Sequence, residues 1–223
     1  MRGLRVQLAR RRERLEAGET PLGWKIGFGS PAALERLALA GPLLGFLLEE
    51  ARVPPGAPVA VGGWTKPVAE PEVAVYLGAD VPPGSPPGEV AAAVAGLGPA
   101  FELADVEFPP DDVEAILAAN VYQRAVVLGP RGTGGADEVT ALAARLLRGG
   151  REWAATDEPE RLTGPVLGLV GHAADLLGAF GERLCAGDVL IAGSVVPPLD
   201  VVPGDRLRFE LEPLGAVEVS LVG

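Results

Sequence analysis

Residues 66–78 have the sequence KPVAEPEVAVYLG, and this stretch decides which kind of fold to expect. Two glutamates, Glu70 and Glu72, stand two positions apart among Val and Ala residues. Side chains at positions i and i+2 of a β-strand point to the same face, so both carboxylates project together. The stretch therefore predicts a half-buried strand that carries two acidic groups on one face.

Other strand-like runs lie on both sides of this segment and are separated by Pro and Gly turns. They are GFLLEE (45–50), PVAV (58–61), PAFELADVEF (99–108), RAVVLG (124–129), DVLIAGS (188–194), RLRFEL (206–211) and AVEVSLVG (216–223). Helices are expected over residues 4–17, 31–41, 88–98 and 165–184, and over a stretch that begins at Asp111 or Asp112 and ends at 123. Ser30 is the expected N-cap of the helix that begins at Pro31. Residues 135–160 are expected to be helix and loop. Strands mixed with isolated helices, without regular βαβ alternation, predict an α+β fold. We expect one domain over residues 1–223, with residues 1–20 forming a short N-terminal helix.

Composition excludes several classes of protein. The chain has 223 residues and a formal charge of −11, which argues against nucleic acid as a partner because phosphate binding needs a basic surface. It has no stretch of 18 apolar residues without charges, so no membrane span is expected. The single cysteine, Cys185, cannot form an internal disulfide and suits a reducing compartment. A cytoplasmic location is the simplest prediction.

The glutamates suggest a metal site. Two carboxylates held close on a half-buried strand repel each other unless a cation or a proton neutralises them, and Mg²⁺ binds carboxylate oxygens readily. The alternative is an edge strand with both glutamates in solvent. Glu102 lies in a second apolar strand, PAFELAD, and supplies a third ligand if that strand faces the first; otherwise it is an ordinary surface residue.

Scarce residue types narrow the choice of other functional groups. Of the 19 Lys and Arg residues only Lys25 and Lys66 are lysine, and Asn120 and His172 are the only residues of their types. Lys can be tuned to transfer protons, which Arg cannot, so Lys25 in GWKIG is a candidate unless it merely extends beside its strand. Asn120 either binds a ligand or caps a helix, and Gly193-Ser194 ends a strand where it can present a backbone amide or a hydroxyl group to a ligand. We expect His172 to be a plain helix residue.

Several segments, in this order, resemble the fumarylacetoacetate hydrolase superfamily, and within it the branch of 2-keto-4-pentenoate hydratases and 4-oxalocrotonate decarboxylases. The similar segments are GWKIGFGSP (23–31), KPVAEPEVAVYLG (66–78), PAFELAD (99–105), AAN followed by VVLG (118–129), and AGDVLIAGS through VPGDRLRFE (186–210). Together they span nearly the whole chain.

The resemblance implies a mixed β-sheet roll flanked by helices and a metal site that holds Mg²⁺ or Mn²⁺. It assigns the metal ligands to Glu70, Glu72 and Glu102 and proton transfer to Lys25. It places Ser30, Asn120 and Ser194 near a small 2-oxo acid substrate. It also implies a homo-oligomer, or a complex with a related decarboxylase or hydratase.

The implied activity is that of a lyase that hydrates 2-hydroxypenta-2,4-dienoate or a similar acid. A decarboxylase of 4-oxalocrotonate, an acylpyruvate hydrolase and a non-catalytic partner subunit are the alternatives. The chain departs from the usual pattern of the hydratases at two places, and from that of the decarboxylase-related sequences at the GNP-like element. Leu43 stands where the hydratases carry an acid, Thr163-Gly164-Pro165 replaces the GNP-like element, and Val121, Tyr122 and Gln123 replace small hydroxyl residues.

Overall fold

The structure is a computed structural model that describes residues 1–132 and 142–223. Its α-helices are α1 (Arg2–Glu16), α2 (Pro31–Arg36), α3 (Pro87–Ala93), α4 (Val113–Ala118) and α5 (Val166–Ala179). Its strands are β1 (Pro21–Gly27), β2 (Leu43–Leu48), β3 (Pro58–Ala60), β4 (Pro67–Leu77), β5 (Val94–Asp105), β6 (Gln123–Leu128), β7 (Ala143–Arg148), β8 (Arg151–Thr156), β9 (Val189–Ser194), β10 (Leu199–Asp200), β11 (Arg206–Glu212) and β12 (Gly215–Val222).

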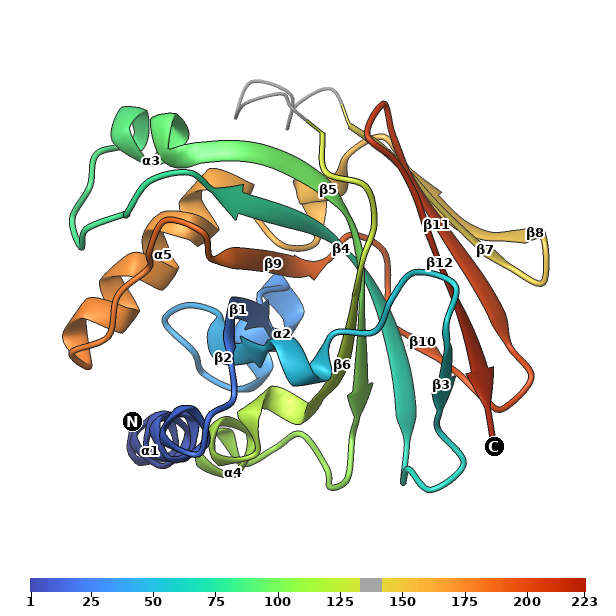
Figure 1. Cartoon of the computed structure of the whole chain (residues 1–223), viewed down its shortest axis with the longest axis horizontal. Helices are drawn as coiled ribbons and strands as arrows, with labels where there is room; N and C mark the ends of the chain where they lie inside the picture. The colour runs from blue at the N-terminus through green and yellow to red at the C-terminus, as the bar shows by residue number, and fades with distance from the viewer. Residues whose placement is uncertain (133–141) are drawn as a thin grey trace.

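These strands form two mixed sheets. The first has the order β2-β1-β9-β4-β5-β6, with β10 paired to β4, and the second has the order β3-β12-β11-β7-β8. The β1–β9 and β12–β3 pairs are parallel, whereas β4 is antiparallel to both β5 and β9. Figure 1 shows the second sheet on one side of the first, and helices α1, α3, α4 and α5 on the other. This arrangement confirms the predicted α+β fold with flanking helices.

The two sheets share a hydrophobic core. The rings of Phe101 on β5 and Phe209 on β11 are both fully buried, and they meet edge to face with their centroids 6.0 Å apart. Because successive side chains of a strand point to opposite faces, Glu102 projects from the face of β5 opposite to Phe101. The sheet-to-sheet core therefore directs the acidic side chain toward the helical side of the first sheet.

The N-terminal helix packs against this helical side. Leu4 and Leu8 of α1 are buried, and the buried Gln7 between them donates from Nε2 to the carbonyls of Leu44 on β2 (3.0 Å) and Leu117 on α4 (2.8 Å). The helix ends just before Gly18, as predicted. The two predicted caps are also present: Ser30 Oγ accepts from the Ala33 amide, and Asp112 caps α4.

Five predicted helices need correction. Those expected to reach residues 123 and 184 end at Ala118 and Ala179. Helix 88–98 ends at Ala93, because residues 94–98 (VAGLG) include two glycines that disfavour a helix, and they pair with β4 as part of β5. The helix that begins at Pro31 ends at Arg36 instead of continuing to Gly41. Residues 143–156 form the β7–β8 hairpin and not helix and loop; Gly149 and Gly150, both with positive φ, supply its two-residue turn. Of the rest of that prediction, residues 135–141 lie outside the described residues, and the end agrees with it, since Pro159–Arg161 form a short 3₁₀ helix.

No helix among residues 1–132 and 142–223 combines the length and the apolar character needed to cross a bilayer. The prediction of a single domain over residues 1–223 stays a prediction.

Candidate metal centre

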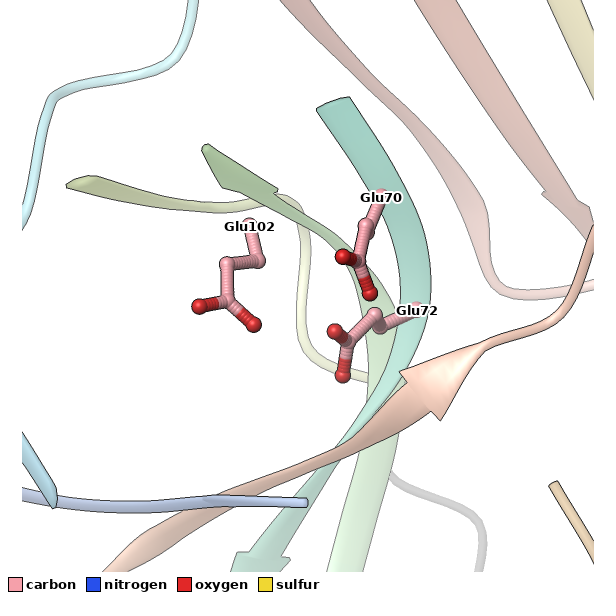
Figure 2. A group of neighbouring side chains, drawn as sticks. All are labelled: Glu70, Glu72 and Glu102. Atoms are coloured by element: carbon pink, nitrogen blue, oxygen red, sulfur yellow. The ribbon is translucent and has the colours of Figure 1, made fainter. Parts of the chain in front are cut away.

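Three glutamates from two neighbouring strands converge at one point. Glu70 and Glu72 lie on β4, and Glu70 stands directly opposite Glu102 of β5. Each of the three offers an oxygen within 4.8 Å of the other two, and Figure 2 shows the three carboxylates turned toward a common space. Because β4 lies between β5 and β9, it is a central strand, and the alternative of a solvent-facing edge strand is wrong.

A β-bulge fixes the position of Glu72. The β4–β9 pairing runs from Glu72↔Ser194 to Ala74↔Ile191, so β9 has one residue more than β4 over this interval. Gly193 lies in the bulge with φ +85°, a conformation that side chains with a Cβ rarely adopt. Its amide consequently donates to Glu72 Oε2 at 2.6 Å. The bulge thus turns a backbone group of β9 toward the acidic cluster.

Two carboxylate oxygens of the cluster lack hydrogen-bond partners among the described residues. They are Glu72 Oε1 and Glu102 Oε2, and both parent side chains are fully buried. Buried carboxylate oxygens without a donor are costly, and a hard divalent cation is a natural partner because it prefers oxygen ligands. The residues present therefore fit a site for Mg²⁺ or a similar ion.

The electrostatics of the cluster lead to the same conclusion. Burial, followed by the charge of Glu102, raises the pKa of Glu70 to about 7. Burial and the charges of Glu102 and Glu70 raise the pKa of Glu72 well above its usual value, and burial raises that of Glu102. On the same face the strands carry Ala74 and Ala100, which offer no polar contact. Without a cation, the cluster tends to hold protons.

Lys25 lies at the edge of the acidic cluster. It is 2% exposed, and its Nζ donates to Glu102 Oε1 and, at 3.0 Å, to the carbonyl of Val121. Gly45, its partner on β2, makes room for it, since a Cβ at this position would lie 2.8 Å from Lys25 Cγ. The alternative that the Lys25 side chain only extends beside its strand into solvent is therefore wrong.

A cavity of about 410 Å³ opens above the cluster, and both lysines of the chain line it. Glu70 lines the same cavity, which brings a carboxylate and the Lys25 ammonium to one surface. Much of the remaining wall is apolar, with Phe28, Val68 and Leu162 among its side chains. The cavity suits a small organic acid whose charged end lies near the cluster.

The structure separates the three predicted substrate contacts. Ser30 and Ser194 line the cavity; Ser194 Oγ donates to the carbonyl of Val196 at 2.6 Å. Asn120 is not among the lining residues, and its side chain bonds both backbone groups of Phe46 on β2. It does not cap α4, whose C-cap is Ala119; Asn120 instead begins a kinked 3₁₀ turn at Asn120–Tyr122.

Other candidates lie away from this cavity or are inert. His172 is on α5, as predicted, and its Nε2 contacts the carbonyl of Pro42 at 2.9 Å. Burial raises the pKa of the Cys185 thiol, which opposes reactivity. Leu43, at the position where the hydratases carry an acid, is 2% exposed in the hydrophobic core.

Sequence reasoning missed the Val121 carbonyl, and it expected the backbone amide at Gly193-Ser194 to face a ligand, whereas the Gly193 amide donates to Glu72. Both are backbone groups, so their side chains carry no signal of this role. The glycine in IAGS at the end of an apolar strand was the only hint that the backbone departs from regular pairing there.

Comparisons with known proteins agree with this geometry. Residues 30–222 match the fumarylacetoacetate (FAA) hydrolase C-terminal family. The chain is 29% identical over 220 residues to a 2-hydroxyhexa-2,4-dienoate hydratase of Comamonas testosteroni (96% of this chain, 83% of the relative). It is 28% identical over 220 residues to a 4-oxalocrotonate decarboxylase of Pseudomonas putida (97% and 83%). The solved structure of the 4-oxalocrotonate decarboxylase from Pseudomonas putida G7, complexed with magnesium and adipate, superposes with a TM-score of 0.90 at 25% identity and covers 99% of this chain and 85% of that one.

Proposed function

This chain belongs to the fumarylacetoacetate (FAA) hydrolase C-terminal family, and on that premise we propose that it is a metal-dependent lyase of small 2-oxo and 2-hydroxy-dienoic acids. Its relatives include hydratases and decarboxylases of such acids. Hydration of 2-hydroxypenta-2,4-dienoate or a close analogue is the reaction that we assign to it.

One observation carries the proposal. Glu72 Oε1 and Glu102 Oε2 are buried without a hydrogen-bond partner among the described residues, and both side chains cluster with Glu70, which lines a cavity together with Lys25. Glu70, Glu72 and Glu102 would hold the cation, either Mg²⁺ or Mn²⁺. A bound divalent ion would supply Lewis acidity to the carboxylate and 2-oxygen of the substrate, where negative charge develops.

The chain's own residues contribute binding and proton transfer. In the hydration, the proton of the 2-hydroxyl group leaves and C5 gains one, which gives the 2-oxo-3-enoate; water then adds as hydroxide at C4 and a proton at C3. We assign the movement of these protons to Lys25 Nζ, which is at the cavity wall beside Glu102. The apolar side chains of Phe28 and Leu162 suit the hydrocarbon end of the substrate.

Decarboxylation of 4-oxalocrotonate is the second candidate. It is supported by the similarity to the decarboxylase from Pseudomonas putida G7, whose solved structure contains magnesium. In that reaction the C–C bond to the distal carboxylate breaks, and the electron pair that remains is stabilised through the 2-oxygen. The same three glutamates serve both reactions, so the substrate distinguishes them.

Acylpyruvate hydrolysis ranks below these two reactions. Hydrolysis of a C–C bond needs a general base that activates water, and a His–Glu pair usually provides it. The only histidine of the chain, His172, is not among the lining residues, and its Nε2 is engaged with the carbonyl of Pro42.

A non-catalytic partner subunit is the alternative outside the enzyme class. The apolar residue at position 43 favours it, whereas Lys25 and the three glutamates oppose it because a subunit without activity has no need for them. We also propose a homo-oligomer, which the resemblance to the family implies, and light scattering at micromolar concentration tests it.

Turnover assays test the function. The protein loaded with Mg²⁺ is mixed with 2-hydroxypenta-2,4-dienoate in ¹⁸O-labelled water, and we expect loss of the dienol absorbance with ¹⁸O in 4-hydroxy-2-oxopentanoate. Release of CO₂ from 4-oxalocrotonate, without that product, would instead support the decarboxylase. Turnover of neither acid at saturating Mg²⁺ would contradict both assignments.

A further inference from the structure

The turn after α4 has an unusual backbone. Asn120, Val121 and Tyr122 have φ values of 55°, 53° and 64°, so three consecutive residues other than glycine adopt the left-handed conformation. Asparagine tolerates this conformation, but a β-branched valine rarely does. Such a conformation persists only where surrounding contacts impose it, and it concentrates at functional sites.

Asn120 attaches this turn to the edge of the first sheet. Its Oδ1 accepts from the Phe46 amide at 2.8 Å, and its Nδ2 donates to the Phe46 carbonyl at 2.9 Å. Phe46 lies on β2, which is an edge strand of the first sheet and pairs only with β1 among the described strands. The amide therefore satisfies both backbone groups of Phe46 and is 8% exposed.

Two glycines let the turn approach β1 and β2. A Cβ at Gly27 would lie 2.8 Å from Val121 Cγ1, and a Cβ at Gly45 would lie 3.1 Å from Asn120 Oδ1. Gly45 is also the partner of Lys25 across the β1–β2 pair. The turn, both glycines and Lys25 thus occupy one closely packed region.

The turn directs one carbonyl toward Lys25. Val121 O accepts from Nζ at 3.0 Å, and Glu102 Oε1 accepts a second N–H. A lysine ammonium has three N–H donors, so two acceptors on different elements fix its orientation and leave one donor. Because Lys25 lines the cavity, the remaining donor is available to a bound substrate.

We propose that Asn120 is a positioning residue for Lys25: its clamp on Phe46 holds Val121 in the left-handed turn, and the Val121 carbonyl orients the ammonium toward the cavity. This inference rests on the proposed function for its catalytic consequence. This role takes the place of the direct contact between Asn120 and substrate that the resemblance implied, because both polar atoms of the Asn120 amide already have partners.

The chain offers a matched control. Gln7, like Asn120, is a buried amide that makes two hydrogen bonds to backbone groups, one of them to β2. Its partners are Leu44 and Leu117, and neither of them accepts a hydrogen bond from Lys25 Nζ, which donates to Glu102 and Val121. Gln7→Ala therefore removes a similar pair of bonds and leaves the Val121 carbonyl in place.

Lys25 can be observed without turnover. With only two lysines in the chain, selective ¹⁵N-lysine labelling gives two Nζ signals in an NMR spectrum, and a Lys66→Arg variant identifies them. In Asn120→Ala we expect the Lys25 signal to shift or to vanish through exchange with water, whereas Gln7→Ala leaves it unchanged. The affinity for Mn²⁺ should stay within about twofold, since the three glutamates are untouched.

Kinetics provide the second readout. We expect kcat of Asn120→Ala to fall by about tenfold or more with little change in KM, as for a misplaced proton-transfer group. If Asn120→Ala does not fold, Asn120→Gly is the second variant. It also removes the two hydrogen bonds to Phe46, and glycine adopts the left-handed conformation without steric cost. We expect the same change in the Lys25 signal and the same fall in kcat.

Two results would overturn the proposal: a Lys25 signal that is unaffected in Asn120→Ala, or a rise in KM with unchanged kcat, which indicates direct substrate contact. The NMR and Mn²⁺ measurements need no substrate. Absence of turnover by the unaltered protein would therefore contradict the proposed function alone. The NMR comparison of Asn120→Ala with Gln7→Ala would still test the positioning of Lys25.

Discussion

Glu70 and Glu102 face each other across the β4–β5 pair, although 31 residues of chain separate them. Directly opposite residues of an antiparallel pair share a face, so each carboxylate is held near the other by backbone pairing alone. Their repulsion is the physical reason that this site should require a cation.

Removal of one ligand tests the metal site. In Glu102→Gln we expect the affinity for Mg²⁺ or Mn²⁺ to fall by at least about tenfold, because even groups behind a ligand contribute about 10–100-fold. Titration calorimetry measures this change. Glu89→Gln, at an exposed position of α3, is the control and should bind as the unaltered protein does. Equal affinity in both variants would remove Glu102 from the site.

Metal affinity should increase with pH. A cation competes with protons for the cluster, and burial with the charge of Glu102 raises the pKa of Glu70 to about 7, while that of Glu72 lies well above its usual value. We therefore expect weaker Mn²⁺ binding at pH 6 than at pH 8 in titrations at constant ionic strength. An affinity independent of pH over this range would show that the cluster does not hold protons.

The stability of the metal-free protein should change in the opposite direction. The folded-state pKa of Glu70 is raised above the ordinary value near 4.3, so its contribution to stability is present below that value and is lost as pH rises through about 7. Thermal melts without metal should show a lower Tm at pH 8 than at pH 6. Mg²⁺ should raise Tm more at pH 8, and Glu70→Gln should flatten the dependence.

Substitution of the two lysines separates catalysis from cavity charge. Lys25→Ala should reduce kcat by about 10²–10⁴-fold, the usual contribution of a proton-transfer group, whereas Lys66→Ala, which removes a cavity charge paired with Asp200, should largely retain kcat. Metal titration of both variants excludes loss of the cation as the cause. Normal turnover by Lys25→Ala would refute its proposed role.

The bulge at Gly193 can be tested with a second glycine. Gly193→Ala and Gly187→Ala both place a Cβ at positive φ, so each should lower the free energy of unfolding by about 1–2 kcal/mol in urea titrations. Only Gly193 donates to Glu72, and a Cβ there would lie 3.1 Å from Thr163 Cγ2, whereas Gly187 is in open space. We therefore expect weakened Mn²⁺ binding in Gly193→Ala alone.

Local patterns predicted much of this molecule because they depend on neighbours in the chain. Glu70 and Glu72 share a face through strand alternation, and Ser30 and Asp112 are caps through hydrogen bonds to residues close in sequence. Where several conformations are locally acceptable, the prediction failed, as for residues 94–98, which were expected to continue a helix and belong to β5.

The sequence by itself determined the strand-rich α+β class, the acidic pair and the exceptional position of Lys25, since alternation and composition are properties of the chain. Only the tertiary structure decided that Glu102 completes the pair, that a bulge brings the Gly193 amide to Glu72, and that Asn120 bonds Phe46. Each of these depends on pairing between segments distant in sequence. The free energy of such pairing comes from the whole sheet and its core, so no short stretch of residues encodes it.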